Sequence, residues 1–225
     1  MKKLILVVLC ALVTTHCSTS EKKSGTASSG KSAAGFQLPP FKTMKLANGL
    51  EVLLIEDHKL PMFSLILMSK TGSRIDPKGK AGLSLLMTSM LEKGTKHKTA
   101  PQIADAFGQL ASDFDADVDL DDYTFTTGGI SKDRNAIIEL YTEVLFEPAF
   151  SQTELTRLKK QIIAGIQQGY DDPDEFTDQA FNSQLMAPHP YGRPVEGTIR
   201  ELQKISVKDI KDFYAQNLTP ETSML

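Results

Sequence analysis

Apolar and polar positions repeat with two different periods along this chain, and each change of period marks a change of element. Between Met44 and Asp57, two runs of alternating apolar residues flank the pair Asn48-Gly49, which predicts a β-hairpin. The run 62–70, "MFSLILMSK", predicts a third strand, and 112–120 and 122–130 predict two more. The stretch "NLTPETSML" begins a further apolar strand.

Apolar residues at helical spacing fill the intervals between and after these strands. Helices are expected over 82–95, 100–110 behind a Thr99 cap, 133–145, 152–168 behind a Ser151/Glu154 capping box, and 174–185. Short helices should begin after Thr198 and Ser206, each with an acidic residue three positions later. Clustered strands followed mainly by helices predict an α+β fold, in which a mainly antiparallel sheet of about five to six strands packs against several α-helices.

The first 35 residues have a different composition from the rest. An apolar run, Leu4 to Val13, follows Lys2 and Lys3 and ends near Cys17, and the segment 18–35 is rich in Ser, Gly and Lys. This resembles a bacterial lipoprotein export signal followed by a flexible tether. We therefore expect residues 1–17 to be a signal peptide, Cys17 to be lipidated, and the protein to be membrane-anchored in the cell envelope, facing the periplasm. An ordinary cleaved secretory signal is the alternative.

Composition sets limits on the remaining segment, 36–225, which we expect to be one domain of a longer protein, cut off at its C-terminal end. The 225 residues are 40% hydrophobic and 24% charged with a formal net charge of −3, so no basic surface argues for nucleic acid. The two cysteines are Cys10 and Cys17. The domain therefore has neither a disulfide framework nor thiolate metal ligands.

Other candidate chemistry in the sequence is weak. Aspartates occupy every second position in one predicted strand: Asp113, Asp115, Asp117, Asp119 and Asp121. A calcium loop of the EF-hand type would need glycine and glutamate where Val118 and Thr124 stand, so a solvated strand face with Phe114, Ala116, Val118 and Leu120 turned inward is favoured.

Histidine and serine offer no clear site either. His58, His97 and His189 are too far apart in sequence to form a helical metal-binding pair, and we expect no zinc site assembled from them. Ser89 has no sequence neighbour that could activate it as a nucleophile.

Three longer segments carry a family resemblance. They read "LANGLEVLLIEDHKLP", "GSRIDPKGKAGLSLLMTSMLEKGT" and "HPYGRPVEGT". Together they resemble the N-terminal domain of the pitrilysin/insulinase zinc metallopeptidases, in the branch that contains mitochondrial processing peptidase. The resemblance implies a LuxS-like, processing-peptidase-like domain over about 36–225.

Active members carry an inverted H-x-x-E-H motif on the helix that corresponds to 82–95. Aligned on the flanking Gly-Leu and Met-Leu-x-Lys-Gly-Thr, the two histidines fall on Leu85 and Ser89, and the glutamate base falls on Thr88. The third zinc ligand of the family, a glutamate, falls on Gly165, or on Ala164 if the register slips by one. Leucine and glycine have no donor atoms, and hydroxyls are poor zinc ligands.

The resemblance therefore implies a pseudoenzyme with no zinc and no catalytic residue of its own, inactive alone. Because active and inactive chains are commonly paired in this family, we expect a scaffold or substrate-holding subunit that binds peptide or unfolded protein and forms a heterodimer with an active zinc-peptidase homologue. Two alternatives stay open: an active metalloendopeptidase whose ligands are supplied elsewhere, and a stand-alone envelope module that binds peptides along a strand edge. In each case the helix retains its apolar residues, Leu83, Leu86, Met87, Met90 and Leu91, for packing.

Overall fold

A computed structural model describes residues 39–225. The expected signal peptide, the tether and Cys17 lie outside the described residues. Within residues 39–225, no helix has both the length and the apolar character needed to cross a membrane.

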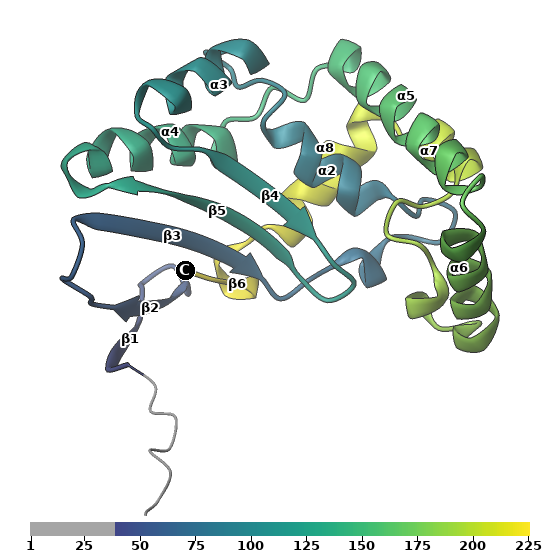
Figure 1. Cartoon of the computed structure of the whole chain (residues 1–225), viewed down its shortest axis with the longest axis horizontal. Coiled ribbons are helices and arrows are strands. Elements are labelled where there is room, and N and C mark those ends of the chain that lie inside the picture. Colours follow the sequence, from purple (N-terminus) through teal and green to yellow (C-terminus); the bar gives the residue numbers. More distant parts are fainter. Residues whose placement is uncertain (1–38) are drawn as a thin grey trace, which may run out of the picture. The chain divides into compact units, whose positions relative to one another are not determined.

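A mixed, mostly antiparallel six-stranded sheet forms one layer of the domain, in the order β1-β2-β6-β3-β5-β4 (Figure 1). The strands are β1 Phe41–Lys45, β2 Glu51–Ile55, β3 Met62–Ser69, β4 Phe114–Val118, β5 Tyr123–Ile130 and β6 Ser223–Met224. Neighbouring strands are antiparallel except β2 and β6, which are parallel. The predicted α+β fold with a mainly antiparallel sheet is confirmed.

The β1–β2 hairpin forms where Asn48-Gly49 predicts it. Phe41 pairs with Ile55 and Lys45 with Glu51, so the turn lies between Lys45 and Glu51. Gly49 has φ of +92°, a left-handed conformation that glycine adopts without steric cost, and the Asn48 side chain accepts a hydrogen bond from the Leu50 amide at 3.2 Å.

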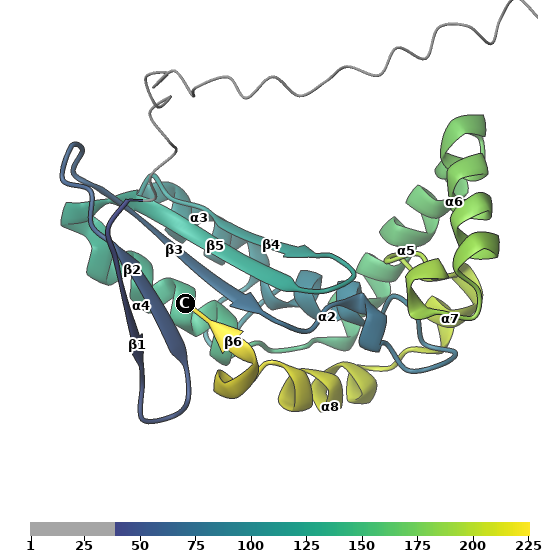
Figure 2. The ribbon, with the colours of Figure 1, turned by 90° about the horizontal axis from the view of Figure 1, so that it is seen from below.

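Helices form the second layer. They are α2 Leu83–Leu91, α3 Ala100–Gln109, α4 Arg134–Phe146, α5 Gln152–Gly169, α6 Pro173–Met186, α7 Ile199–Lys204 and α8 Val207–Asn217. Four short 3-10 turns complete the described chain: η1 Ser73–Ile75, η2 Ser131–Asp133, η3 Pro190–Gly192 and η4 Pro220–Thr222. Seen from below, α2, α4 and α8 lie along one side of the sheet, while α6 stands apart at the end of the domain (Figure 2).

Helix α2 is the centre of the core. Its expected packing residues, Leu83, Leu86, Met87, Met90 and Leu91, are all buried, at 2% exposure or less. They join Phe125 of the sheet and Val144 of α4 in one apolar cluster. The helix ends at Leu91, earlier than the predicted Thr95, because Gly94 adopts φ of +140°, which a helix cannot contain.

The predicted helix caps are confirmed with one exception. Capping boxes form at Thr99 and Ser206, and the Thr198 side chain accepts from the Glu201 amide. The Ser151/Glu154 box was wrong, because Ser151 makes no side-chain cap bond and the Glu154 carboxylate pairs with Arg157 at 2.8 Å.

Candidate functional site

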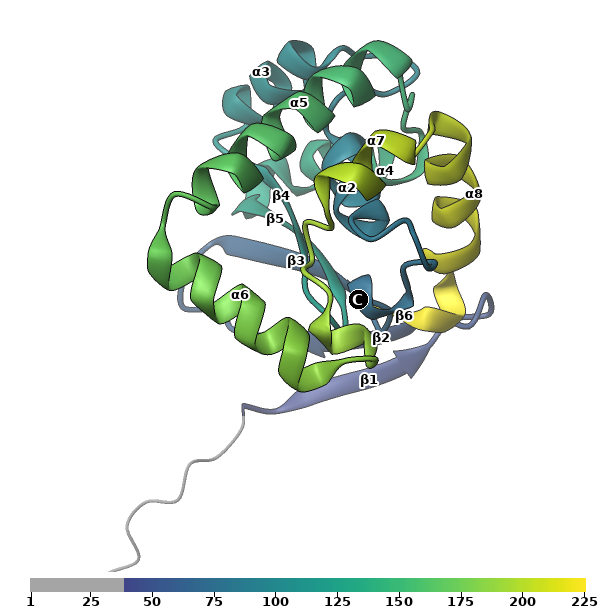
Figure 3. The same ribbon diagram turned by 90° about the vertical axis from the view of Figure 1, so that its right-hand side faces the viewer.

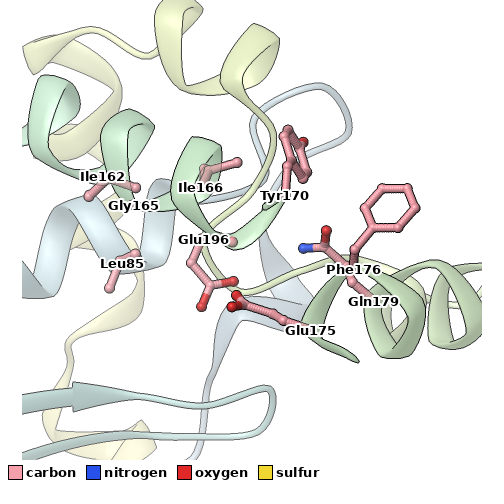
Figure 4. A pocket seen from close by; sticks show the side chains of 10 residues that line it. Leu85, Ile162, Gly165, Ile166, Tyr170, Glu175, Phe176, Gln179 and Glu196 are labelled. Atoms are coloured by element: carbon pink, nitrogen blue, oxygen red, sulfur yellow. The ribbon is translucent and has the colours of Figure 1, made fainter. Parts of the chain in front are cut away.

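A cavity of about 280 Å³ opens where α2 and α5 cross, and it is lined by two of the four positions that the resemblance aligns with zinc ligands or the catalytic base. Leu85 enters from α2, and Gly165 lies opposite on α5 with Ile162 and Ile166 beside it (Figure 4). Residues 80 positions apart in the sequence therefore meet at one site. The alternative register position, Ala164, is exposed and does not line the cavity.

The other two positions, Thr88 and Ser89, do not line the cavity. Thr88 is fully buried, and its hydroxyl donates hydrogen bonds to the Ser84 and Leu85 carbonyl oxygens, each at 3.1 Å. Bonding of this kind to the preceding turn is usual for helical threonine. Ser89 is half-buried and does not line the cavity.

These residues do not fit a zinc ion. A zinc site takes three or four nitrogen, sulfur or oxygen ligands from the protein, and Leu85 and Gly165 supply none. Across residues 39–225, no group of three or more His, Cys, Asp or Glu side chains is placed to hold a metal. Lack of space does not prevent a ligand side chain at position 165, since a Cβ added at Gly165 would meet no heavy atom within 4 Å.

Two carboxylates give the cavity a different chemistry. Glu175 comes from the first turn of α6 and Glu196 from the loop after η3, and their side chains point toward one another across the opening (Figure 4). Gly169 makes room for this arrangement, because a Cβ there would lie 2.7 Å from Glu175 Oε1. Sequence reasoning missed both glutamates, although Glu196 lies within the quoted segment "HPYGRPVEGT".

Aromatic side chains form the outer wall of the cavity. Tyr170 and Phe176 contact each other edge to face, with ring centroids 6.1 Å apart and an interplanar angle of 85°. Both are about half exposed, at 49% and 51%. With Leu85 and the two isoleucines of α5, they make a mostly apolar recess that has carboxylates at one side.

The loop that carries Glu196 is fixed against the beginning of α2. Gly197 has φ of +73°, and a Cβ there would lie 2.0 Å from the Ala81 carbonyl oxygen. At Gly82, φ is +90° and a Cβ would lie 2.5 Å from the Glu196 carbonyl oxygen. Since the added Cβ would meet a backbone oxygen in both cases, and the backbone cannot easily move away, only glycine fits at either position.

Hydrogen bonds from Arg193 and to Asp76 reinforce this junction. The Arg193 guanidinium donates to the Asp76 carbonyl oxygen at 2.7 Å and to the Arg74 carbonyl oxygen at 2.8 Å. The Asp76 carboxylate accepts from the Gly82 amide at 2.8 Å and the Ser84 amide at 3.0 Å, so it caps the first turn of α2. Burial raises the pKa of the Asp76 carboxyl, and the hydrogen bonds from Ser84 and Gly82 oppose that rise.

Among the described residues, the three histidines lie away from this cavity, and none of them lines it. His58 is exposed, 3.8 Å from a Glu56 oxygen, and His97 is exposed, 3.2 Å from Glu147. His189 accepts a hydrogen bond from the Tyr191 amide at 3.3 Å and so caps the η3 turn.

The aspartate-rich strand adopts the predicted alternation. Asp115 and Asp117 of β4 are exposed, whereas Phe114, Ala116 and Val118 are half-buried. Asp121, beyond the strand, accepts from the Tyr191 hydroxyl at 2.8 Å and lies 2.7 Å from Arg74 Nε.

Comparison with known proteins defines the class. The family model described as Insulinase (Peptidase family M16) matches residues 51–199, and the chain belongs to this family.

Two curated relatives show how differently similar chains are named. An uncharacterized zinc protease of Rickettsia bellii is 25% identical over 185 residues, which cover 82% of this chain and 45% of the relative. The non-peptidase homolog YmxG of Helicobacter pylori is 28% identical over 165 residues, 73% of this chain and 38% of the relative. The chain thus spans about half the length, or less, of the curated relatives it matches.

Solved structures agree with the fold. A crystal structure of a peptidase M16 inactive domain from Pseudomonas fluorescens superposes with a TM-score of 0.80 at 28% identity, covering 82% of this chain and 45% of that one. A Helicobacter pylori protease superposes with a TM-score of 0.78 over 84% of this chain and 46% of that one, and at 20% identity this likeness shows the fold alone.

Proposed function

We propose that this chain is a non-catalytic member of the insulinase family, in the branch that resembles mitochondrial processing peptidase. In this proposal it holds peptide segments and acts as a scaffold or substrate-holding subunit beside an active zinc-peptidase homologue. The observation that supports this proposal most strongly is the cavity. Leu85 and Gly165 line it at positions that the family resemblance assigns to zinc ligands, and Glu175 and Glu196 face its opening. The names of the Helicobacter pylori non-peptidase homolog and the Pseudomonas fluorescens inactive domain support it.

The chemistry of the cavity suggests what part of a peptide it accepts. Apolar walls from Leu85, Ile162 and Ile166 suit an aliphatic stem, and the carboxylates of Glu175 and Glu196 suit a cationic end. A lysine or arginine side chain combines these two properties. Hydrogen bonds to charged groups contribute about 1.5 to 3 kcal/mol, so one such side chain can decide which peptide binds.

Peptide binding can be tested with a matched pair of ligands. Two fluorescent peptides that differ only by lysine against norleucine have the same stem, so their affinity ratio isolates the charge. We expect the lysine peptide to bind about tenfold tighter, a difference of about 1.4 kcal/mol. Glu175→Gln and Glu196→Gln should each reduce that ratio, and Asp105→Asn on the exposed surface of α3 should leave it unchanged. Equal affinity for both peptides would contradict the proposed recognition.

The non-catalytic and partner roles need separate measurements. Purified alone, the chain should contain no stoichiometric zinc and should not cleave peptides, and from its source cell it should co-purify with a homologue that retains H-x-x-E-H. Stoichiometric zinc in the isolated chain would refute the non-catalytic proposal.

A second candidate is an active metalloendopeptidase whose ligands come from another segment or chain, and the zinc-protease name of the Rickettsia bellii relative favours it. Substitution of Leu85 should then impair turnover directly. A third is a stand-alone envelope module, which would bind peptides with no associated chain.

Export and anchoring stay proposals, because Cys17 lies outside the described residues. We propose a lipid anchor at Cys17. A Cys17→Ser chain should not incorporate radiolabelled fatty acid and should no longer be found in the membrane fraction. Incorporation of the label into the Cys17→Ser chain would exclude an anchor at Cys17.

A further inference from the structure

Helix α6 is the least integrated element of the domain. None of its residues is buried, and it packs mainly against the η3 turn. Figure 3 shows it at the outer edge of the molecule, away from the helices that cover the sheet. Its inner side is marked by Gln179 and Ser183, which are half-buried and four residues apart.

The opposite side of α6 carries a stripe of four residues. Asp174, Asp178, Phe181 and Leu185 follow one another at spacings of four, three and four, which places them along one line of the helix. Phe181 is 62% exposed and Leu185 is 61% exposed, the largest values for the large apolar residues of this helix. Spacing of this kind is typical of the seam by which one helix contacts another.

The charged residues near the stripe are all acidic. No lysine or arginine occurs between Lys160 and Arg193, whereas five carboxylates do: Asp171, Asp172, Asp174, Glu175 and Asp178. Within residues 39–225, none of the five has a cationic group within 4.0 Å. The helix dipole favours Asp174 in the first turn, but Asp178 lies beyond that turn and gains little from it.

We propose that this stripe is a docking seam for a helix of a partner protein. The partner helix presents lysine or arginine side chains to Asp174 and Asp178 and apolar side chains to Phe181 and Leu185. Charge excludes the obvious alternatives. Parallel pairing of two copies through α6 would bring two acidic clusters together, and antiparallel pairing would place the same carboxylates against Phe181 and Leu185 with no cation beside them. An anionic lipid surface would repel these carboxylates.

This inference goes beyond the peptide-holding role, because the two use different sides of α6. Glu175 and Gln179 line the cavity, whereas the stripe points away from it. The partner helix and a bound peptide could therefore occupy the chain at the same time.

Designed helices provide the probe. Two synthetic peptides of about 21 residues, long enough to be helical, carry a 4-3-4 seam that reads Lys-Lys-Leu-Leu in one and Leu-Leu-Lys-Lys in the other, to match parallel and antiparallel docking. A third peptide replaces lysine by glutamate. Fluorescence anisotropy against the full chain should show binding of one lysine peptide, weakened by added salt, and no binding of the glutamate peptide.

Variants of the chain then locate the seam. Phe181→Ser/Leu185→Ser and Asp174→Asn/Asp178→Asn should each weaken binding of the lysine peptide at least tenfold, while circular dichroism stays unchanged because all four side chains are exposed and no cation is placed at the helix N-terminus. Phe146→Ser, at a 56% exposed position on α4, is the matched apolar control and should have no effect. Glu196→Gln, which alters the cavity but none of the five carboxylates near the stripe, should also leave helix binding intact, and this separates the inference from the cavity.

Three outcomes would overturn the seam. They are equal binding of the glutamate peptide, binding that is insensitive to both stripe variants, and self-association of the chain that the stripe variants abolish.

Discussion

A ligand-restoring variant offers the sharpest test of how α2 and α5 are arranged. Leu85→His, Ser89→His and Gly165→Glu together introduce the three donors that the family resemblance assigns to these positions. Thr88 is left unchanged because it is fully buried, and a carboxylate there would be desolvated. The variant should gain zinc binding without gaining peptidase activity.

The cost of the three changes can be worked out from burial and helix propensity. Ser89→His adds little, because serine and histidine have similar helix propensities and Ser89 is only half-buried. Leu85 is half-buried, so replacing it loses roughly half of the 1.5 to 3 kcal/mol of a fully buried leucine, about 1 kcal/mol. Gly165→Glu gains about 0.5 kcal/mol of helix propensity. A Cβ at that position meets nothing within 4 Å, so it adds no clash. We expect the metal-free variant to be about 0.5 to 1 kcal/mol less stable than the natural chain.

Zinc should more than reverse that loss. At a free zinc concentration of 100 times Kd, binding to the folded state adds about 2.7 kcal/mol to the free energy of unfolding. For a domain of this size that corresponds to a rise in Tm of about 5 to 11 °C. Differential scanning fluorimetry with and without zinc measures the shift, and elemental analysis measures the stoichiometry.

The control is the double variant Leu85→His/Ser89→His, which lacks the third ligand and should show a smaller shift. If the triple variant gains no more zinc-dependent stability than the double variant, Gly165 does not face Leu85 and Ser89 as a ligand position.

Two further predictions concern the packing of α2. Lys80 donates a hydrogen bond to Asp209 and lowers its pKa to about 2, below the ordinary 3.8. Because the folded pKa is depressed, this stabilisation is present above about pH 4 and is lost as the pH falls toward 2; after solvent screening it is on the order of 1 kcal/mol. Asp209→Asn should lower the urea midpoint at pH 7 and lower it much less at pH 2, where Asp209 is largely protonated in the unfolded chain and about half protonated in the folded one. An equal loss at both pH values would contradict the ion pair. Gly197→Ala should cost more than Gly79→Ala in urea unfolding, because both glycines have positive φ but only Gly197 would press a Cβ onto the Ala81 carbonyl oxygen. Equal losses would mean that the loop and α2 are not in contact.

The local elements follow closely from local patterns. Asn48-Gly49 specified the hairpin, and the apolar residues of α2 specified which of its faces is buried, because turn geometry and helix periodicity depend on neighbouring residues. Local patterns are weaker at helix ends, where Ser151 and Glu154 had the spacing of a capping box but formed no cap.

The arrangement of distant elements did not follow from local patterns. The pattern of apolar residues did not indicate that β6 would lie between β2 and β3. A short loop joins β2 directly to β3, so the two strands would be expected to be neighbours. Strand order depends on long-range backbone pairing, and the register of Glu51 with Met224 joins residues at opposite ends of the described chain.

The sequence alone determined which donor atoms could exist at the family positions, because side-chain chemistry is fixed by residue type. Leucine at position 85 and glycine at position 165 have no lone pair to offer in any fold. Only the tertiary structure decided that these two positions border one cavity and that Glu175 and Glu196 face its opening, because separate helices and loops meet there through packing. The exposure of the α6 stripe is also a tertiary property, since periodicity shows that residues share a face but not what covers that face.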